Sequence, residues 1–157
     1  MLQPNGFPRP LLQLKVSTPI LLLRNLDPSR GLCNGTRMVV TRLGQHGIVA
    51  RIMGTEFDGE ERIIPRVKLI QNDDDLGFQR SRTQLPVTIC FAMTINKSQG
   101  QSVTYVGLNM KAAVFTHGQF YVAISRVRSV NNIKVIWDEN QGHGVTKNVV
   151  YPEVLLN

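Results

Sequence analysis

Short runs of apolar and β-branched residues follow one another closely over the first 70 positions, with turn-forming residues between them. The first run contains Pro19, which has no amide hydrogen to donate and therefore suits an edge strand or a bulge. Five residues with two glycines join the second run to the third, as in a hairpin. The runs cover residues 11–26, 36–42, 48–53 and 61–70. Because no helical period separates them, the pattern predicts a small barrel or sandwich over about residues 12–71.

The composition changes at residues 72–85, where three acids precede two arginines and little can be buried. Runs of charge are usually exposed, so this stretch is predicted to be a solvated connector. Asp73, Asp74 and Asp75 also resemble a metal site or the acidic box of an ATPase. That box should close a buried apolar strand, whereas these acids lie in a polar stretch, so we expect an exposed loop.

The pattern changes again at Pro86. Residues 87–93 are almost continuously apolar, which is typical of a strand covered on both faces of an α/β sheet. Residues 103–110 and 133–137 predict two more strands. Residues 86–137 are therefore expected to form an α/β unit, followed by a tail at 138–157 whose pattern predicts nothing definite.

A helix is expected between the last two strands. Thr116 and Gln119 form a T-x-x-Q capping box, which predicts a helix beginning near His117. The apolar residues spaced i, i+4, i+7 should then face the core. They are Phe120, Ile124 and Val127.

The charge favours an anionic partner. The formal net charge is +7 in 157 residues, and 42% of the residues are hydrophobic. An excess of this size favours polyanions, nucleic acid first. No run is long enough for a membrane helix, and the first ten residues lack the features of a secretion signal, so we expect a soluble intracellular protein without a membrane partner. Cys33 and Cys90 form no CxxC pair and are expected to be reduced thiols.

Residues 94–100 form a polar turn at the end of the predicted buried strand. A turn there lies at the carboxyl edge of the sheet, where open α/β folds bind ligands. Thr94 can cap a short helical turn and Gly100 can end it in the left-handed conformation. The side chains offer hydroxyl, amide and ammonium groups suited to phosphate oxygens, and they belong to Thr94, Asn96, Lys97, Ser98 and Gln99. An ordinary polar loop is the alternative.

Arg126 is the second candidate. Near the end of the predicted helix, its guanidinium is placed to bind a phosphate in a bidentate manner. The alternative is a surface residue that complements the helix dipole.

Further cations decorate the predicted barrel and connector. If they converge on one face, they form a basic track for nucleic acid, and if they do not, they are scattered surface charges. They are Arg37, Arg42, Arg51, Arg62, Arg66, Lys68, Arg80 and Arg82.

Two segments carry a resemblance to a known family. FAMTINKSQGQS resembles motif V, and GQFYVAISRVRS resembles motif VI, of superfamily-one DNA helicases of the Pif type and their Helitron-like transposon relatives. LKVSTPILLLRNLDPSRGLCNGTRMVV is similar to the region of that family that leads into a small barrel of the Src-homology-three type. The resemblance extends to about Trp137.

The resemblance implies an α/β fold: part of the second RecA-like motor domain of a P-loop NTPase, with an inserted small β-barrel. The implied organisation is an extended lead-in at 1–11, the barrel at 12–71, the connector at 72–85, the RecA-like part at 86–137 and the tail at 138–157.

The resemblance also implies roles for single residues. Arg126 matches the arginine finger, the one catalytic residue implied, and Gln99, Gly100 and Arg126 match positions that face the nucleotide. Single-stranded DNA would be contacted by Thr94, Asn96, Lys97 and Ser98. Asn96 stands where many members have histidine, which weakens its assignment. Gln119 and Tyr121 also lie in motif VI, and we expect Tyr121 to pack.

A phosphate loop, G-x-x-x-x-G-K-[ST], is absent from the printed sequence, as is an acidic box closing an apolar strand. We therefore expect the carboxyl-terminal portion of a helicase whose amino-terminal motor domain lies elsewhere. The intact enzyme would use ATP and Mg²⁺, translocate 5′ to 3′ on single-stranded DNA or DNA junctions, and act in the nucleus or mitochondrion. This chain alone would bind neither cofactor tightly and hold no metal. The alternative is a non-catalytic helicase-derived module that binds a nucleic acid or a protein partner.

Overall fold

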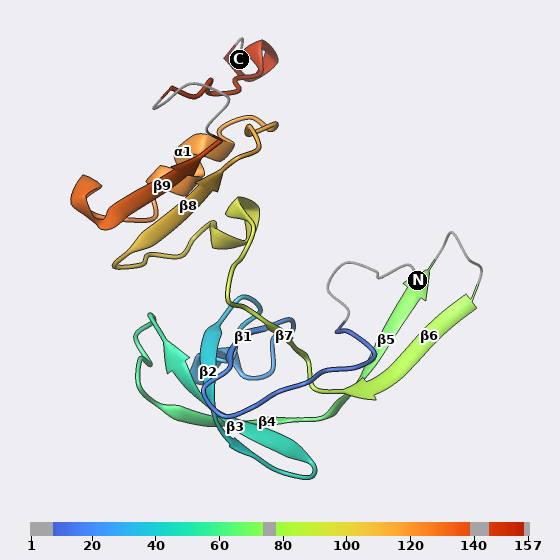
Figure 1. The fold of residues 1–157 in the computed structure, drawn as a ribbon. Coiled ribbons are helices and arrows are strands. Elements are labelled where there is room, and N and C mark those ends of the chain that lie inside the picture. Colours follow the sequence, from blue (N-terminus) through green and yellow to red (C-terminus); the bar gives the residue numbers. More distant parts are fainter. Residues whose placement is uncertain (1–7, 74–77, 139–144, 156–157) are drawn as a thin grey trace. The chain divides into compact units, whose positions relative to one another are not determined.

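The described residues of the computed structural model are 8–73, 78–138 and 145–155, and they belong to two separate units. The first unit is Met1–Ala92 and the second is Met93–Asn157 (Figure 1). The division therefore falls seven residues beyond the 85/86 boundary expected from composition. No helix among the described residues is long and apolar enough to cross a membrane.

The first unit is built on a five-stranded antiparallel sheet with the order β4-β3-β2-β1-β7. Its strands are β1 (Pro19–Leu22), β2 (Arg37–Leu43), β3 (Gly47–Met53), β4 (Glu61–Pro65) and β7 (Val87–Ile89), with a 3-10 helix η1 (Pro28–Arg30) after β1. The predicted hairpin between the second and third runs is confirmed as β2 and β3. Of the long first run, only β1 is a strand.

One face of this sheet holds the core of the unit. In β2 and β3 alternate residues are buried, as the pleat requires. In β1 three consecutive residues, Ile20–Leu22, are buried. The fully buried side chains include Ile20, Leu22, Met38, Val40, Ile52, Ile64 and Val87. Leu12, Leu14, Leu26 and Phe57, from the lead-in and the loops, pack against them.

The five strands pair as an open sheet, because β4 and β7 lie at its two edges. The closed Src-homology-three barrel expected for residues 12–71 is therefore not seen among the described residues. A series of short strands predicts a β-rich unit, but it does not tell whether the last strand pairs with the first.

Much of the connector expected at 72–85 belongs to a second pair of strands, which begins at Val67 within the expected barrel. β5 (Val67–Asp73) and β6 (Phe78–Gln84) pair antiparallel and extend from the sheet as a ribbon (Figure 1). The prediction of a loop was wrong there because strand pairing uses main-chain groups, which a polar composition does not remove. Asp74 and Asp75, and the side chain of Asp73, lie outside the described residues, so their exposure stays a prediction.

The strand expected at 87–93 is also different. β7 has three residues and pairs antiparallel with β1, with Val87 opposite Leu22 and Ile89 opposite Ile20. Phe91, expected inside, is 75% exposed. An apolar run predicts burial but not the partner strand. Here the partner is the apolar strand β1, which is antiparallel to β7, where a parallel strand was expected. The carboxyl-edge argument for the turn that follows therefore does not hold.

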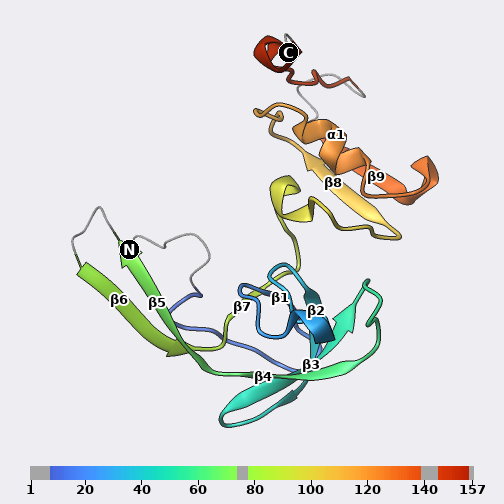
Figure 2. The same ribbon diagram turned by 180° about the vertical axis from the view of Figure 1, so that it is seen from behind.

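The second unit is a β-α-β arrangement. β8 (Val106–Met110) and β9 (Ile133–Trp137) are parallel, and the crossover between them contains α1 (Gln119–Ile124) (Figure 2). Leu108, Met110 and Val114 form its core with Ala123 of the helix. The expected α/β pattern is confirmed for these elements. Three 3-10 helices complete the unit, namely η2 (Ile95–Ser98), η3 (Val130–Asn132) and η4 (Pro152–Leu155).

Candidate functional site

The polar turn after the first unit is a capped single turn of helix. The main-chain amide of Lys97 donates to the Thr94 side chain at 3.4 Å, so Thr94 caps η2 as predicted. Gly100 has φ +77°, the expected left-handed conformation, and a Cβ there would meet nothing within 4 Å. Glycine is therefore favoured at this position by its backbone conformation, not by a lack of space.

The turn is also held together by its own side chains. The Ser98 hydroxyl donates to the Ile95 carbonyl oxygen at 2.6 Å, and the Gln101 side-chain amide donates to the Lys97 carbonyl oxygen at 3.1 Å. Ser98 is half-buried and uses its hydroxyl proton internally. The remaining polar side chains predicted for this site are exposed, and they are Thr94, Asn96, Lys97 and Gln99.

Arg126 connects this turn to the helix. It lies just beyond the end of α1 and donates from Nη1 to the Gln101 carbonyl oxygen at 3.1 Å and to that of Ser98 at 3.5 Å. Its Nε donates to the carbonyl oxygen of Val122 at 2.8 Å, and its Nη2 donates to the Ser125 hydroxyl oxygen at 2.7 Å. The two motifs singled out in the sequence therefore meet at this guanidinium.

The backbone reinforces this junction. The amide of Val103 donates to the Arg126 carbonyl oxygen at 3.0 Å. The carbonyl oxygens that Arg126 contacts belong to Ser98 and Gln101, the residues on either side of Gln99 and Gly100. Gln101 was missed by sequence reasoning, because a carbonyl acceptor carries no side-chain signature.

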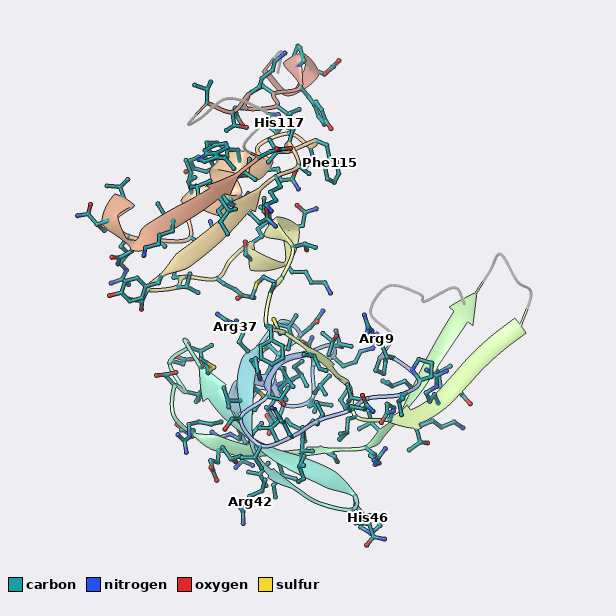
Figure 3. The ribbon with its side chains drawn as sticks, in the orientation of Figure 1. Arg9, Arg37, Arg42, His46, Phe115 and His117 are labelled. Carbon is teal, nitrogen blue, oxygen red and sulfur yellow. The ribbon has the colours of Figure 1, made fainter. Side chains whose placement is uncertain are left out.

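Gln119 has a structural role at the start of α1. It is buried, and its side-chain oxygen accepts from the amides of Phe115 at 3.0 Å and Thr116 at 3.4 Å. The backward contact of the predicted capping box is thus present, although the helix begins at Gln119, with Gly118 as its N-cap. Figure 3 labels Phe115 and His117 in this corner of the second unit.

The exposed face of α1 was assigned incorrectly from its period. Phe120 is partly buried and packs against the core, as expected. Ala123 is buried with Gln119, however, whereas Ile124 is 40% exposed and Tyr121 is 67% exposed. Tyr121, expected to pack, therefore faces solvent in this structure. Six residues of helix present less than two full turns, so the i, i+4, i+7 period does not decide which side is buried.

Three cations of the expected basic track are engaged elsewhere. Arg62 binds the carbonyl oxygen of Arg30 and the carboxylate of Glu60. Arg66 donates to the side-chain oxygen of Gln84 at 3.0 Å, and Arg82 donates to the carbonyl oxygen of Pro8 at 3.2 Å. Lys68 is exposed on β5, and the side chain of Arg80 lies outside those described.

The other three arginines share one face of the sheet. Arg37 lies opposite Met53, Arg51 opposite Val39 and Arg42 opposite Val49, all on the side away from the core. Figure 3 labels Arg37 and Arg42, which come from opposite ends of β2. Arg51 is paired with Glu61 at 3.7 Å, a surface ion pair of small energetic weight. We call Arg37, Arg42 and Arg51 the arginine stripe.

The described residues contain no group of three or more His, Cys, Asp or Glu that could hold a metal ion. A magnesium ion needs carboxylate or other hard oxygen ligands. The oxygen atoms around Arg126 are main-chain carbonyl oxygens and the Ser125 hydroxyl, all of which already accept hydrogen bonds from its own N–H groups, so they do not fit a divalent cation.

Comparisons with known proteins agree on one family. Residues 1–43 match the family model described as DNA helicase Pif1, 2B domain. The ATP-dependent DNA helicase PIF1 of Rattus norvegicus is 36% identical over 138 residues, which cover 80% of this chain and 19% of that protein. The ATP-dependent DNA helicase Pif1 of Bdellovibrio bacteriovorus is 30% identical over 142 residues, covering 90% of this chain and 30% of that protein. The chain thus spans less than a third of the length of these relatives.

Solved structures give the same result. The Pif1 helicase from Bacteroides in complex with ADP-AlF3 and single-stranded DNA matches 99% of this chain and 35% of its own, with a TM-score of 0.65 and 28% identity. A structure of two coordinating Pif1 helicases at forked double-stranded DNA matches 85% of this chain with a TM-score of 0.65 and 30% identity. The fold is therefore that found in part of these RecA-like helicases.

Proposed function

The chain is a portion of a Pif1-type helicase, and from this premise we propose that it supplies the motif V and motif VI side of an enzyme that couples ATP hydrolysis to the unwinding of DNA. In this proposal Arg126 is the arginine finger, and Gln99 and Gly100 lie beside the nucleotide. Thr94, Asn96, Lys97 and Ser98 contact single-stranded DNA.

One observation carries the proposal. The guanidinium of Arg126 touches both sides of Gln99 and Gly100, which brings the finger and the turn into one site although 25 residues separate Arg126 from Gln101. An arginine at this place can stabilise the charge that develops on a transferring phosphoryl group. The exposed side chains of the same turn leave hydroxyl, amide and ammonium donors available to a DNA backbone.

ATP and Mg²⁺ would be used by the complete helicase. The described part of this chain offers the phosphate an arginine and a polar turn, but it offers the metal no carboxylate cluster. We therefore infer that the phosphate loop and the metal ligands come from the first motor domain, and that this chain alone does not turn over ATP.

We also infer that the five-stranded sheet is the barrel inserted in the second motor domain, in an open form. No α-helix among the described residues of the first unit covers the inner face of the sheet. Yet Ile20, Met38 and Ile64 of that face are fully buried in one cluster. Leu12, Leu14, Leu26 and Phe57 of the lead-in and loops cover part of that face, and curvature of the sheet around it would enclose the rest, which supports a barrel-like insertion.

The experiment compares this chain with the complete helicase. We expect no DNA-stimulated ATP hydrolysis from the 157-residue chain and clear hydrolysis from the complete enzyme. Arg126→Ala in the complete enzyme should lower kcat by a factor on the order of 10³, with little change in KM, because the finger acts in the transition state. A robust ATPase rate from the 157-residue chain, abolished by Arg126→Ala, would overturn the proposal.

The arginine stripe favours a second candidate function, a non-catalytic module that binds nucleic acid. Its three arginines lie on the sheet face opposite the buried core. Binding of single-stranded DNA by the 157-residue chain, with affinity that falls steeply as salt rises, would support this candidate. Absence of binding at low salt would exclude nucleic-acid binding by this chain and favour a protein partner.

A further inference from the structure

The guanidinium of Arg126 is a junction between two segments in addition to being a candidate finger. Nη1 donates to the carbonyl oxygens of Ser98 and Gln101, and Nε donates to that of Val122 at the end of α1. Nη2 donates to the Ser125 hydroxyl oxygen, and that hydroxyl donates in turn to the Val122 carbonyl oxygen at 3.1 Å. The planar fork of an arginine allows these contacts at once.

In this arrangement Nη1 is not available to a phosphate. Its acceptors are main-chain carbonyl oxygens, which are fixed parts of the turn. To reach a nucleotide across a domain cleft, Nη1 must release both of them. Contact with the turn and contact with a phosphate are therefore alternatives for the two N–H groups of Nη1, and only the second N–H of Nη2 is left for a phosphate while Nη1 holds the turn.

We propose that Arg126 is a positioning residue for the turn at 94–101 as well as a finger, and that its guanidinium alternates between the carbonyl oxygens of that turn and a nucleotide phosphate. The phosphate half of this inference rests on the proposed function. Without nucleotide, Arg126 holds the DNA-contacting turn in the conformation described here. When a phosphate captures the guanidinium, the turn loses that support.

The exchange is favourable because the two acceptors differ in charge. Hydrogen bonds from a guanidinium to an anionic phosphate are shorter and stronger than those to neutral carbonyl oxygens. The nucleotide phosphate is therefore the preferred acceptor of the guanidinium when it is present. By thermodynamic reciprocity, DNA that holds the turn in a different conformation also frees Arg126 and strengthens nucleotide binding.

Apart from the bonds of the guanidinium to Val122 and Ser125, the release affects only the turn. The amide of Val103 donates to the carbonyl oxygen of Arg126, a bond that does not involve the side chain. Thr94 still caps η2, and Ser98 still bonds to Ile95. The loss of the guanidinium therefore leaves the base of the turn attached while the segment around Gln99 and Gly100 becomes more mobile.

The first test measures amide hydrogen exchange by NMR in the 157-residue chain. The probe is the Gln101 amide, which donates to the Ser98 carbonyl oxygen at 3.0 Å. We expect Arg126→Ala to raise its exchange rate roughly tenfold, because opening of the turn becomes easier. Arg126→Lys should give nearly the same increase, since one ammonium group cannot replace the fork.

Arg128→Ala is the matched control. Arg128 is exposed and makes no hydrogen bond or ion pair with any residue that the structure describes, so its removal should leave the Gln101 amide unchanged. The amides of β8 and β9 that donate to the partner strand report whether the unit still folds. If they stay protected in Arg126→Ala and the exchange of Gln101 does not rise, the positioning role is wrong. If Arg126→Ala unfolds the unit, Arg126→Lys decides the same question.

The second test uses the complete helicase with ADP and aluminium fluoride as the phosphate probe. We expect this ligand to raise the exchange of the turn at least threefold in the wild type and to have no effect in Arg126→Ala. Protection of the turn by the ligand in the wild type would overturn the exchange of partners. Loss of ATPase activity in Arg126→Ala with an unchanged turn would leave the finger and remove the positioning role. A loosened turn with normal ATPase activity would keep the positioning role and remove the finger.

Discussion

The main-chain amide of Tyr151 donates a hydrogen bond to Nδ1 of His117 at 2.9 Å, and the two rings lie with their centroids 5.5 Å apart. The amide of Gly118 in turn donates to the carbonyl oxygen of Val149 at 3.0 Å. A segment near the carboxyl end of the described chain therefore binds the residues that precede α1, the helix that leads to Arg126.

His117→Phe separates the two parts of this contact. Phenylalanine keeps a ring against Tyr151 but has no acceptor for its amide. We expect the Tyr151 amide to exchange several times faster, with little change in overall stability because both residues are exposed. Amide exchange by NMR measures the first effect and thermal unfolding the second. An unchanged Tyr151 amide would mean that the ring contact alone holds this segment.

Two neighbouring residues of β4 test the sheet register. Ile64 is fully buried, whereas Ile63 is 71% exposed on the other face. Ile64→Ala should lower the free energy of unfolding by about 2–5 kcal/mol, because it removes buried methyl groups and leaves a cavity. Ile63→Ala should change it by less than about 1 kcal/mol. Urea denaturation measures both, and equal losses would place the strand in another register.

Two glycines with positive φ provide a second matched pair. Gly31 has φ +79°, and a Cβ there would lie 2.5 Å from Cδ2 of Phe57. Gly59 has φ +86°, but a Cβ there would meet nothing within 4 Å. Gly59→Ala should cost about 1–2 kcal/mol from the left-handed backbone alone. Gly31→Ala should cost clearly more in the same denaturation experiment, because Phe57 must also move. Equal costs would show that Phe57 moves freely.

Local elements were predictable from the sequence because their signals are local. The β2–β3 hairpin follows from alternation on both sides of a glycine-containing turn, and β9 has the predicted bounds. The Thr94 cap and the left-handed Gly100 follow from the conformational preferences of single residues. These features need no knowledge of distant partners.

Pairing between distant segments was not predictable in the same way. The apolar run that begins at Val87 is compatible with a parallel or an antiparallel partner, and β1 is the partner found. The roles of Thr94, Asn96, Lys97 and Gln99 in DNA and nucleotide binding remain predictions. The contact of Arg126 with Gln101 could not be predicted either, because its acceptor is a main-chain carbonyl oxygen, which every residue has.

The arginine stripe leads to the last prediction, on DNA binding. The side chains of Arg37 and Arg42 form no hydrogen bond or ion pair with another described residue, whereas the side chain of Arg51 is paired with Glu61. If the stripe binds single-stranded DNA, the double variant Arg37→Gln, Arg42→Gln should weaken binding by the 157-residue chain and flatten the salt dependence. Each lost phosphate contact lowers the slope of log K against log salt by about 0.7, so a loss of about 1.4 is expected.

The control is the double variant Lys111→Gln, Lys134→Gln, which removes the same net charge from exposed positions of the second unit. Fluorescence anisotropy titrations between 50 and 200 mM salt, the range over which a phosphate-driven interaction changes most visibly, compare the two variants. An equal loss in both would mean that net charge, not the stripe, attracts the DNA.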